Sequence, residues 1–261
     1  MLGKVDLDNF ALSASTMADA SGELIRRDQE TNFEIQIKDD GSPVTSVDKA
    51  AERRIRGIIS ELHPDHGIIG EEYPPSAADR EFVWAIDPID GTLPFLAGFP
   101  VFGTLIALLH RGVPVLGVID MPITRERWIG GSNLPTTHNG NPVTTRACEN
   151  LAAAMMSTSN PDYYDEATNP ALKRMQQATK LTIYGGSCLA YGQIASGRID
   201  VGIDVQFDIY DYLALVPIID GAGGIISDWK GNSLDVNSGD RFIAAGDART
   251  HAEALEVLNQ T

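Results

Sequence analysis

The chain of 261 residues contains few cysteines, because only Cys148 and Cys188 occur in it. Two cysteines are too few for a disulfide framework, and their spacing is not that of a metal-binding cysteine motif. The histidines also lack metal-ligand spacing, and we expect them to be surface or core residues: His63, His66, His110, His138 and His251. The sequence therefore predicts a protein of a reducing compartment without a thiolate metal site.

Positive charge is also scarce. The chain has 20 lysines and arginines against 36 aspartates and glutamates, which gives a formal net charge of −16. This balance opposes attraction to nucleic-acid polymers and to anionic lipid surfaces. It opposes phosphate binding as well, unless metal cations reverse the sign of the local field. The charge therefore excludes a nucleic-acid polymer as partner and gives a first indication of metal ions.

Long apolar runs are absent. The most apolar stretch, residues 95–109, contains Pro100 and two glycines and is too short to span a bilayer. The segment 1–6 carries the acidic Asp6 where a signal peptide would have an apolar core. A nucleotide-binding Gly-x-x-x-x-Gly-Lys-(Ser/Thr) string is missing too, which disfavours a nucleotide kinase. We therefore expect a cytoplasmic protein that has no membrane partner.

The hydrophobic pattern divides the chain into two parts, residues 1–145 and 146–261. The first part predicts helices and mostly antiparallel strands: helices 5–27 and 45–62, strands 33–38, 67–70, 82–86, 101–109 and 113–119, and a further strand at Ile129. The second part alternates short elements: strands 152–157, 181–184, 199–203, 224–227 and 242–245, and helices 170–179, 189–196, 212–222 and 248–258. We therefore expect an α+β half and an α/β half with a mixed sheet, packed together with the site at their interface.

The segment Asp87–Thr92 is the strongest chemical signal. It places Asp87 and Asp90 at the end of an apolar strand, and Pro88 restricts the backbone between them. Such carboxylates are hard oxygen ligands that suit Mg²⁺, and the free N–H groups of Gly91 and Thr92 can meet an anion. Asp-Pro and Asp-Gly are also ordinary turn dipeptides. The complete string after an apolar strand nevertheless favours a metal and phosphate site.

Three separated segments resemble motifs of the inositol monophosphatase family. Gly70-Glu71-Glu72 is similar to its Gly-Glu-Glu element, Asp87–Thr92 to its Asp-Pro-(Ile/Leu)-Asp-Gly-Thr element, and Asp211 with Gly223-Gly224 to its carboxyl-terminal Asp…Ala-Gly-Gly element. They occur in the family's order over nearly the whole chain. The resemblance implies a layered αβαβα sandwich, a magnesium-dependent and lithium-sensitive phosphatase with two or three Mg²⁺ ions per site, and a homodimer.

The resemblance also implies a set of metal ligands drawn from both halves, most of them from the first. They are Glu71, Asp87, the main-chain carbonyl of Ile89, Asp90 and Asp211. Two metal ions about 4 Å apart can stabilise the attacking and leaving oxygens of an in-line displacement, which requires bridging carboxylates. Asp87 is the bridge by resemblance. Considered alone, Glu71 would be a solvated loop acid and Asp211 a helix-start acid.

Proton transfer is expected from Asp48 and Thr92. As structure, Thr45–Asp48 forms a capping box at a helix start. In the family, however, an aspartate at this position orients the motif threonine, so Asp48 would orient Thr92, which would help remove a proton from the attacking water. The expected catalytic residues are therefore Asp48, Thr92 and Glu71, and the expected phosphate contacts are Gly91 and Thr92.

Candidate substrate contacts lie downstream. The segment Tyr184–Cys188 follows a strand and precedes a helix, and a simple connection would explain its glycines. In the family this loop faces the substrate, which makes Gly186, Ser187 and Cys188 candidate contacts. Asp204 matches the acidic position that holds the organic part of the substrate, although it also fits a turn acid at a strand end.

Several scaffold segments look most like the histidinol-phosphate phosphatase branch of the family. They are residues 42–45, 102–108, 117–120, 126–128 and 210–217. Scaffold residues indicate ancestry better than substrate. Leu93-Pro94 and Asp208-Ile209 depart from that branch, which usually has a cation at each place, and these departures make the site more acidic.

We therefore expect hydrolysis of histidinol phosphate to histidinol and phosphate, a step of histidine biosynthesis. An inositol or other polyol monophosphatase stays open, as does a nucleotide 3′-phosphatase. A different class also stays open, namely a noncatalytic regulator that has kept the fold and binds a protein. The complete ligand set disfavours the regulator, since a binding module has no need of the pair Asp48 and Thr92.

Overall fold

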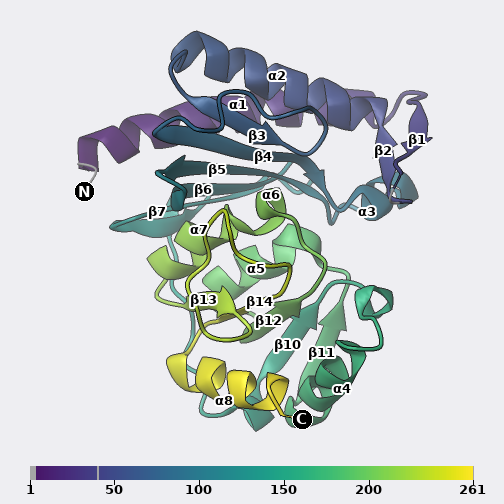
Figure 1. Cartoon of the computed structure of the whole chain (residues 1–261), viewed down its shortest axis with the longest axis vertical. Helices are drawn as coiled ribbons and strands as arrows, with labels where there is room; N and C mark the ends of the chain where they lie inside the picture. The colour runs from purple at the N-terminus through teal and green to yellow at the C-terminus, as the bar shows by residue number, and fades with distance from the viewer. Residues whose placement is uncertain (1–3, 40, 261) are drawn as a thin grey trace.

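The structure, a computed structural model, describes residues 4–39 and 41–260. Five layers follow one another in Figure 1: helices α1 and α2, a seven-stranded sheet, helices α5, α6 and α7, a five-stranded sheet, and helices α4 and α8. This arrangement confirms the predicted αβαβα sandwich. The amino-terminal residues 1–3, on which part of the signal-peptide argument rests, lie outside the described residues. No described helix is long and apolar enough to cross a membrane.

The first layer consists of α1 (Lys4–Asp28) and α2 (Ser46–Leu62), both predicted from their spacing. Their apolar faces are buried against each other and against the first sheet, because residues three and four apart lie on one side of a helix. Helix α2 begins at the predicted capping box, in which the Thr45 side chain accepts from the Asp48 amide and the Asp48 side chain accepts from the Thr45 amide. The cap fixes where α2 starts.

A short hairpin precedes α2. Strand β1 (Ile35–Ile37) is shorter than the predicted strand 33–38, and it pairs with β2 (Pro43–Thr45), which the sequence did not predict. The predicted turn at 39–43 lies between them, and its residue 40 lies outside the described residues. Pro43 has no N–H group and sits on a two-stranded edge, where a missing donor is tolerated.

The seven-stranded sheet has the order β3-β4-β5-β6-β7-β8-β9. Only β3 and β4 pair in parallel, and the other pairs are antiparallel. The bounds are β3 Gly67–Gly70, β4 Phe82–Asp90, β5 Gly103–His110, β6 Val113–Met121, β7 Glu126–Gly131, β8 Leu134–His138 and β9 Asn141–Pro142. The predicted further strand at Ile129 is confirmed as β7. Strands β8 and β9 were not predicted, because they are short and polar and each contains a proline.

The five-stranded sheet has the order β11-β10-β12-β14-β13 and is mixed, as predicted. Its strands are β10 Met155–Thr158, β11 Leu181–Tyr184, β12 Val201–Asp204, β13 Ile225–Asp228 and β14 Phe242–Ala245. The predicted start of the first strand at residue 152 is wrong. Residues Leu151–Ala153 form the 3₁₀ helix η1 instead, because the Asn150 side chain accepts a hydrogen bond from the Ala153 amide.

Three helices separate the sheets: α5 (Ser187–Ala195), α6 (Ile209–Tyr212) and α7 (Leu215–Gly221). The predicted helix 212–222 is confirmed as the shorter α7, and the separate helix α6 before it was not predicted. They pack closely on the first sheet, and a side chain at Gly117 of β6 would meet the Ala214 carbonyl oxygen at 2.0 Å. The predicted outer helices are confirmed as α4 (Asn169–Ala178) and α8 (Ala248–Leu258).

Candidate metal and phosphate site

The carboxyl end of β4 carries two of the predicted ligands. The pairing of β4 with β5 shifts register between Asp87 and Asp90, and such a bulge redirects side chains at the end of a strand. The Ile89 amide donates to Asp87 Oδ1 at 2.9 Å. The buried Thr104 hydroxyl donates to the Pro88 carbonyl at 2.8 Å, which holds the turn of the motif from β5. The local sequence therefore fixes the direction of both aspartates.

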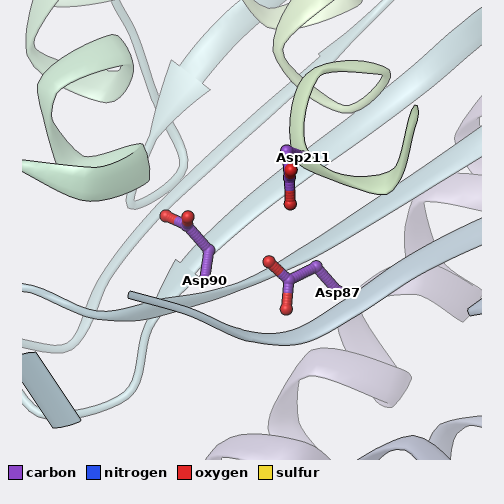
Figure 2. A group of neighbouring side chains, drawn as sticks. All are labelled: Asp87, Asp90 and Asp211. Atoms are coloured by element: carbon purple, nitrogen blue, oxygen red, sulfur yellow. The ribbon is translucent and has the colours of Figure 1, made fainter. Parts of the chain in front are cut away.

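The third carboxylate comes from the other half of the chain. Asp211 is the third residue of α6, and its Oδ2 accepts from the Asp208 amide at 2.8 Å in a capping box. One oxygen each from Asp87, Asp90 and Asp211 lies within 4.8 Å of the other two. Figure 2 shows the three side chains converging from β4 and α6. Three residues predicted as ligands are thus brought together; we call them the acidic trio.

Electrostatics make the acidic trio costly in the absence of a cation. Burial and then the charges of Glu71, Asp211 and Asp90 raise the pKa of Asp87 well above its usual range. Burial, and then the charges of Asp90 and Glu71, also raise the pKa of Asp211 well above its usual range. Burial also raises the pKa of Asp90, although the Cys188 amide opposes it. The trio therefore favours either protons or a multivalent cation.

Glu71 lies near the acidic trio but is paired differently. Its amide donates to the Ile86 carbonyl at 3.2 Å, and its Oε1 accepts from Lys38 Nζ at 2.7 Å. The same ammonium bonds Glu72 Oε1 at 2.8 Å. Burial by itself would lower the pKa of Lys38, but the two glutamates outweigh it and raise that pKa. Lys38 therefore supplies a cation at the predicted ligand Glu71.

Glu72, the second glutamate of the pair, is linked to α2. Its amide donates to Oε2 of the fully buried Glu52 at 2.7 Å, and Glu52 Oε1 accepts from Arg56 at 2.7 Å. Burial raises the pKa of Glu72 to about 7, with Lys38 acting in the opposite direction. A side chain at Gly70 would meet Glu52 Oε1 at 2.1 Å, so the Gly-Glu-Glu element requires its glycine.

Asp48 and Thr92 have different partners in the structure. Asp48 is fully buried, and its Oδ2 accepts from the amide and the hydroxyl of Thr45. Its Oδ1 is buried and has no hydrogen-bond partner among the described residues. The Thr92 hydroxyl donates to the Ile89 carbonyl at 3.3 Å. The capping role of Asp48 is thus confirmed, and its link to Thr92 stays a prediction that an open acceptor oxygen supports.

The predicted phosphate and substrate loops meet beside Asp90. Gly91 has φ +90°, and a side chain there would lie 2.5 Å from Ser187 Oγ, so the close approach needs glycine. Gly186 and Ser187 are half-buried, and Ser187 has a left-handed φ of 46°. The Cys188 amide donates to Asp90 Oδ2 at 2.5 Å. This loop therefore fixes the position of Asp90.

The Cys188 side chain lies in the core, and contact of this residue with substrate stays a prediction. Its thiol is 3% exposed and lies 3.7 Å from Met121 Sδ in the core, because Gly103 of β5 leaves room for both sulfur atoms. Burial and the charge of Asp90 raise the pKa of this thiol well above its usual value. Cys188 acts on the site only through its backbone amide.

Asp204 is likewise buried. The side chain ends β12 but is 2% exposed. Its Oδ1 accepts from the Thr158 hydroxyl at 3.1 Å and from the amide and hydroxyl of Ser159 at 2.7 and 2.6 Å, and its Oδ2 accepts from the Tyr191 hydroxyl at 2.5 Å. Protein donors therefore enclose the carboxylate, and its contact with substrate stays a prediction. Burial raises its pKa to about 6 against the effect of these donors.

The two departures from the branch pattern lie at the surface. Leu93 is 51% exposed on α3 (Thr92–Ala97), and Asp208 is exposed at the start of α6. The Tyr210 hydroxyl donates to Asp208 Oδ2 at 2.8 Å. Lys38 and Tyr210 were not predicted as site residues. Lys38 directly follows β1 and is the cation nearest to the Gly-Glu-Glu element in space, which sequence spacing does not reveal.

The five-layer αβαβα fold with clustered carboxylates between its halves is that of a family of phosphatases. The chain belongs to the inositol monophosphatase family, whose model matches residues 6–261. It is 44% identical to the bifunctional phosphatase IMPL2, chloroplastic, of Arabidopsis thaliana, over 98% of this chain and 77% of that protein. It is 33% identical to a histidinol-phosphatase of Chlorobaculum parvum, over 83% of this chain and 84% of that protein.

A solved structure agrees with this assignment. The inositol monophosphatase of Zymomonas mobilis superposes with a TM-score of 0.88 and is 38% identical, with 97% of this chain and 98% of that chain covered. The relatives thus include both histidinol and inositol phosphatases.

Proposed function

We propose that the chain hydrolyses a small-molecule phosphate monoester with Mg²⁺ as cofactor. The observation that carries this proposal is the acidic trio, in which the buried Asp87 and the half-buried Asp90 and Asp211 lie within 4.8 Å of one another. In the described part of the chain, Lys38 neutralises Glu71 and Glu72, whereas no lysine or arginine forms an ion pair with the trio. An all-oxygen donor set of this kind suits Mg²⁺.

The trio, Glu71 and the Ile89 carbonyl would hold two or three ions. Bound Mg²⁺ would stabilise charge on the phosphoryl oxygens and lower the pKa of the attacking water. The amides of Gly91 and Thr92 at the start of α3 would orient the phosphate. The Thr92 hydroxyl would accept the proton of the attacking water and pass its own proton to the free Oδ1 of Asp48.

We propose histidinol phosphate as the substrate. The relative from Chlorobaculum parvum is a histidinol-phosphatase, and the exposed Asp208 beside α6 makes the surroundings of the trio more acidic. An acidic rim favours a leaving group that carries an ammonium ion over a neutral one. An inositol phosphate is the second candidate, because the similar structure from Zymomonas mobilis is an inositol monophosphatase.

Phosphate release from a panel tests both statements. The panel contains histidinol phosphate, inositol 1-phosphate, a sugar phosphate and a 3′-phosphonucleotide, each with Mg²⁺ and with a chelator in its place. We expect Mg²⁺-dependent release with the highest kcat/KM for histidinol phosphate. Higher kcat/KM for inositol 1-phosphate would overturn the substrate but not the phosphatase. No Mg²⁺-dependent release from any ester would overturn the function itself.

A further inference from the structure

The carboxyl ends of three strands form one edge of the second sheet. Strands β10 and β11 are parallel, as are β10 and β12, and they end at Thr158, Tyr184 and Asp204. Ligands of α/β sheets bind beyond such carboxyl ends. The loop after β11 leads to the Cys188 amide, which holds Asp90 of the acidic trio at 2.5 Å. The edge therefore faces the place where the leaving group of a bound phosphate ester would lie.

The segment after β10 is rigidly anchored at this edge. It forms the 3₁₀ helix η2 (Pro161–Tyr163), and the Asn160 side chain accepts from the Asp162 amide at 3.0 Å. The next residue, Tyr164, is buried, and its hydroxyl donates to the Ile203 carbonyl at 3.1 Å. The anchored neighbours hold Tyr163 in place, while 38% of it stays exposed.

Tyr163 also lies within the field of the acidic trio. Burial, and then the charges of Asp90, Asp204 and Asp211, raise the pKa of its hydroxyl. The hydroxyl therefore stays protonated, and the ring offers a neutral, electron-rich face in acidic surroundings. An aromatic face in such surroundings attracts cations and stacks with planar rings.

We infer that Tyr163 is a specificity-determining residue whose ring packs against the leaving group and favours a planar, cationic one over a neutral polyol. An imidazole that carries an ammonium arm has this chemistry. The inference rests on the proposed function and deepens it, because it assigns to Tyr163 a recognition of the organic part that does not depend on Asp204, whose carboxylate is enclosed by its own donors.

The variants Tyr163→Leu and Tyr163→Phe test the inference in the full chain with Mg²⁺. The Leu variant removes the ring, and we expect it to lower kcat/KM for histidinol phosphate about tenfold, mainly through KM. Its kcat/KM for glycerol 2-phosphate should change less than about twofold, and Tyr163→Phe should resemble the parent. Leu181→Ala is a control, since Leu181 is also exposed but begins β11, at the opposite end of the paired strands β10 and β11.

Equal losses on both substrates would overturn the inference, because the ring would then only support its loop. Unchanged kcat/KM for histidinol phosphate would overturn it as well. A binding measurement separates it from the proposed function: calorimetry of histidinol with Mg²⁺ and inorganic phosphate needs no turnover. A roughly tenfold rise of Kd in Tyr163→Leu supports the inference even if histidinol phosphate is not cleaved. An unchanged Kd, or no histidinol binding by the parent, overturns it even if the phosphatase proposal stands.

Discussion

Asp204 is buried and the acidic trio is at least half-buried, but the two carboxylate sites have different partners. Asp204 accepts four hydrogen bonds, from the hydroxyls of Thr158, Ser159 and Tyr191 and from the Ser159 amide. Each carboxylate of the trio accepts one backbone amide, and one oxygen of each lies within 4.8 Å of the other two. Donors surround the first site, whereas like charges face one another in the second. We therefore expect a carboxylate at the end of an element to bind a metal ion only when protein donors do not already enclose it.

The largest expected effect comes from the trio itself. Asp87→Asn and Asp211→Asn should lower kcat by at least about 10²-fold, the scale on which one preorganised electrostatic group acts. Asp204→Asn is the matched control, and its kcat should stay much closer to that of the parent. Steady-state phosphate release on variants with native circular dichroism decides the point. A loss in Asp204→Asn as large as in Asp87→Asn would erase the distinction between the two sites.

Thr92 gives the next largest effect. Thr92→Ala should lower kcat roughly 10²-fold with little change in Mg²⁺ affinity, because it removes a proton-transfer group and no ligand. Thr92→Ser keeps the hydroxyl and should retain most of the activity. A near-normal kcat in Thr92→Ala would mean that Asp48 only caps helix α2 and takes no part in proton transfer.

Removing a hydrogen-bond donor of Asp204 should lower the free energy of unfolding. Tyr191→Phe removes the hydroxyl that donates to Asp204 Oδ2, and a buried charged acceptor left with fewer donors costs about 1–3 kcal/mol. Urea unfolding measures this loss. Tyr184→Phe removes an exposed hydroxyl instead and should change the unfolding free energy by less than about 0.5 kcal/mol. Equal effects in the two variants would mean that the network around Asp204 is not structural.

The smallest effect is a pH dependence. The pKa of Asp204 is about 6 in the folded protein, against about 3.9 in an unfolded chain. The folded state thus binds more protons between these values, and the stability from protonated Asp204 is lost as pH rises through 6. The unfolding free energy of the parent, relative to Asp204→Asn, should fall between pH 4.5 and 6.5 by at most about 1.4 kcal/mol per pH unit. A constant difference over this range would contradict the raised pKa.

Much of the fold could be predicted from sequence, because the spacing of apolar residues indicates which face of a helix or strand is buried. The continuous apolar run of β4 identifies a strand that is buried on both faces. The spacing of apolar residues in α1 and α2 identifies helices that are buried on one face. Strands β8 and β9 could not be found in this way, since β8 pairs with β7 and β9 with β8, and their own short polar sequences do not reveal these pairings. Nor does the sequence reveal that the segment between α6 and α7 lies against the first sheet, where Gly117 leaves room for the Ala214 carbonyl.

The site was predictable to a different degree at each residue. Asp87, Asp90 and Asp211 were found because their motifs lie at the ends of regular elements. Asp204 is enclosed by hydroxyls of Ser159 and Tyr191, which lie 45 and 13 residues away in the sequence. No sequence motif connects them with Asp204, so its enclosure could not be predicted. Lys38 was missed for the same reason, since only the hairpin of β1 and β2 brings it to Glu71.

Calorimetric titration of Mg²⁺ into the metal-free protein shows directly whether the acidic trio binds the metal. We expect the parent and Asp204→Asn to bind Mg²⁺ with similar affinity, and Asp87→Asn and Asp211→Asn to bind it at least about tenfold more weakly, as expected when one carboxylate is lost from an oxygen site. Circular dichroism confirms that each variant is folded. Unchanged Mg²⁺ affinity in both Asp87→Asn and Asp211→Asn would contradict the assignment of the acidic trio as the metal site.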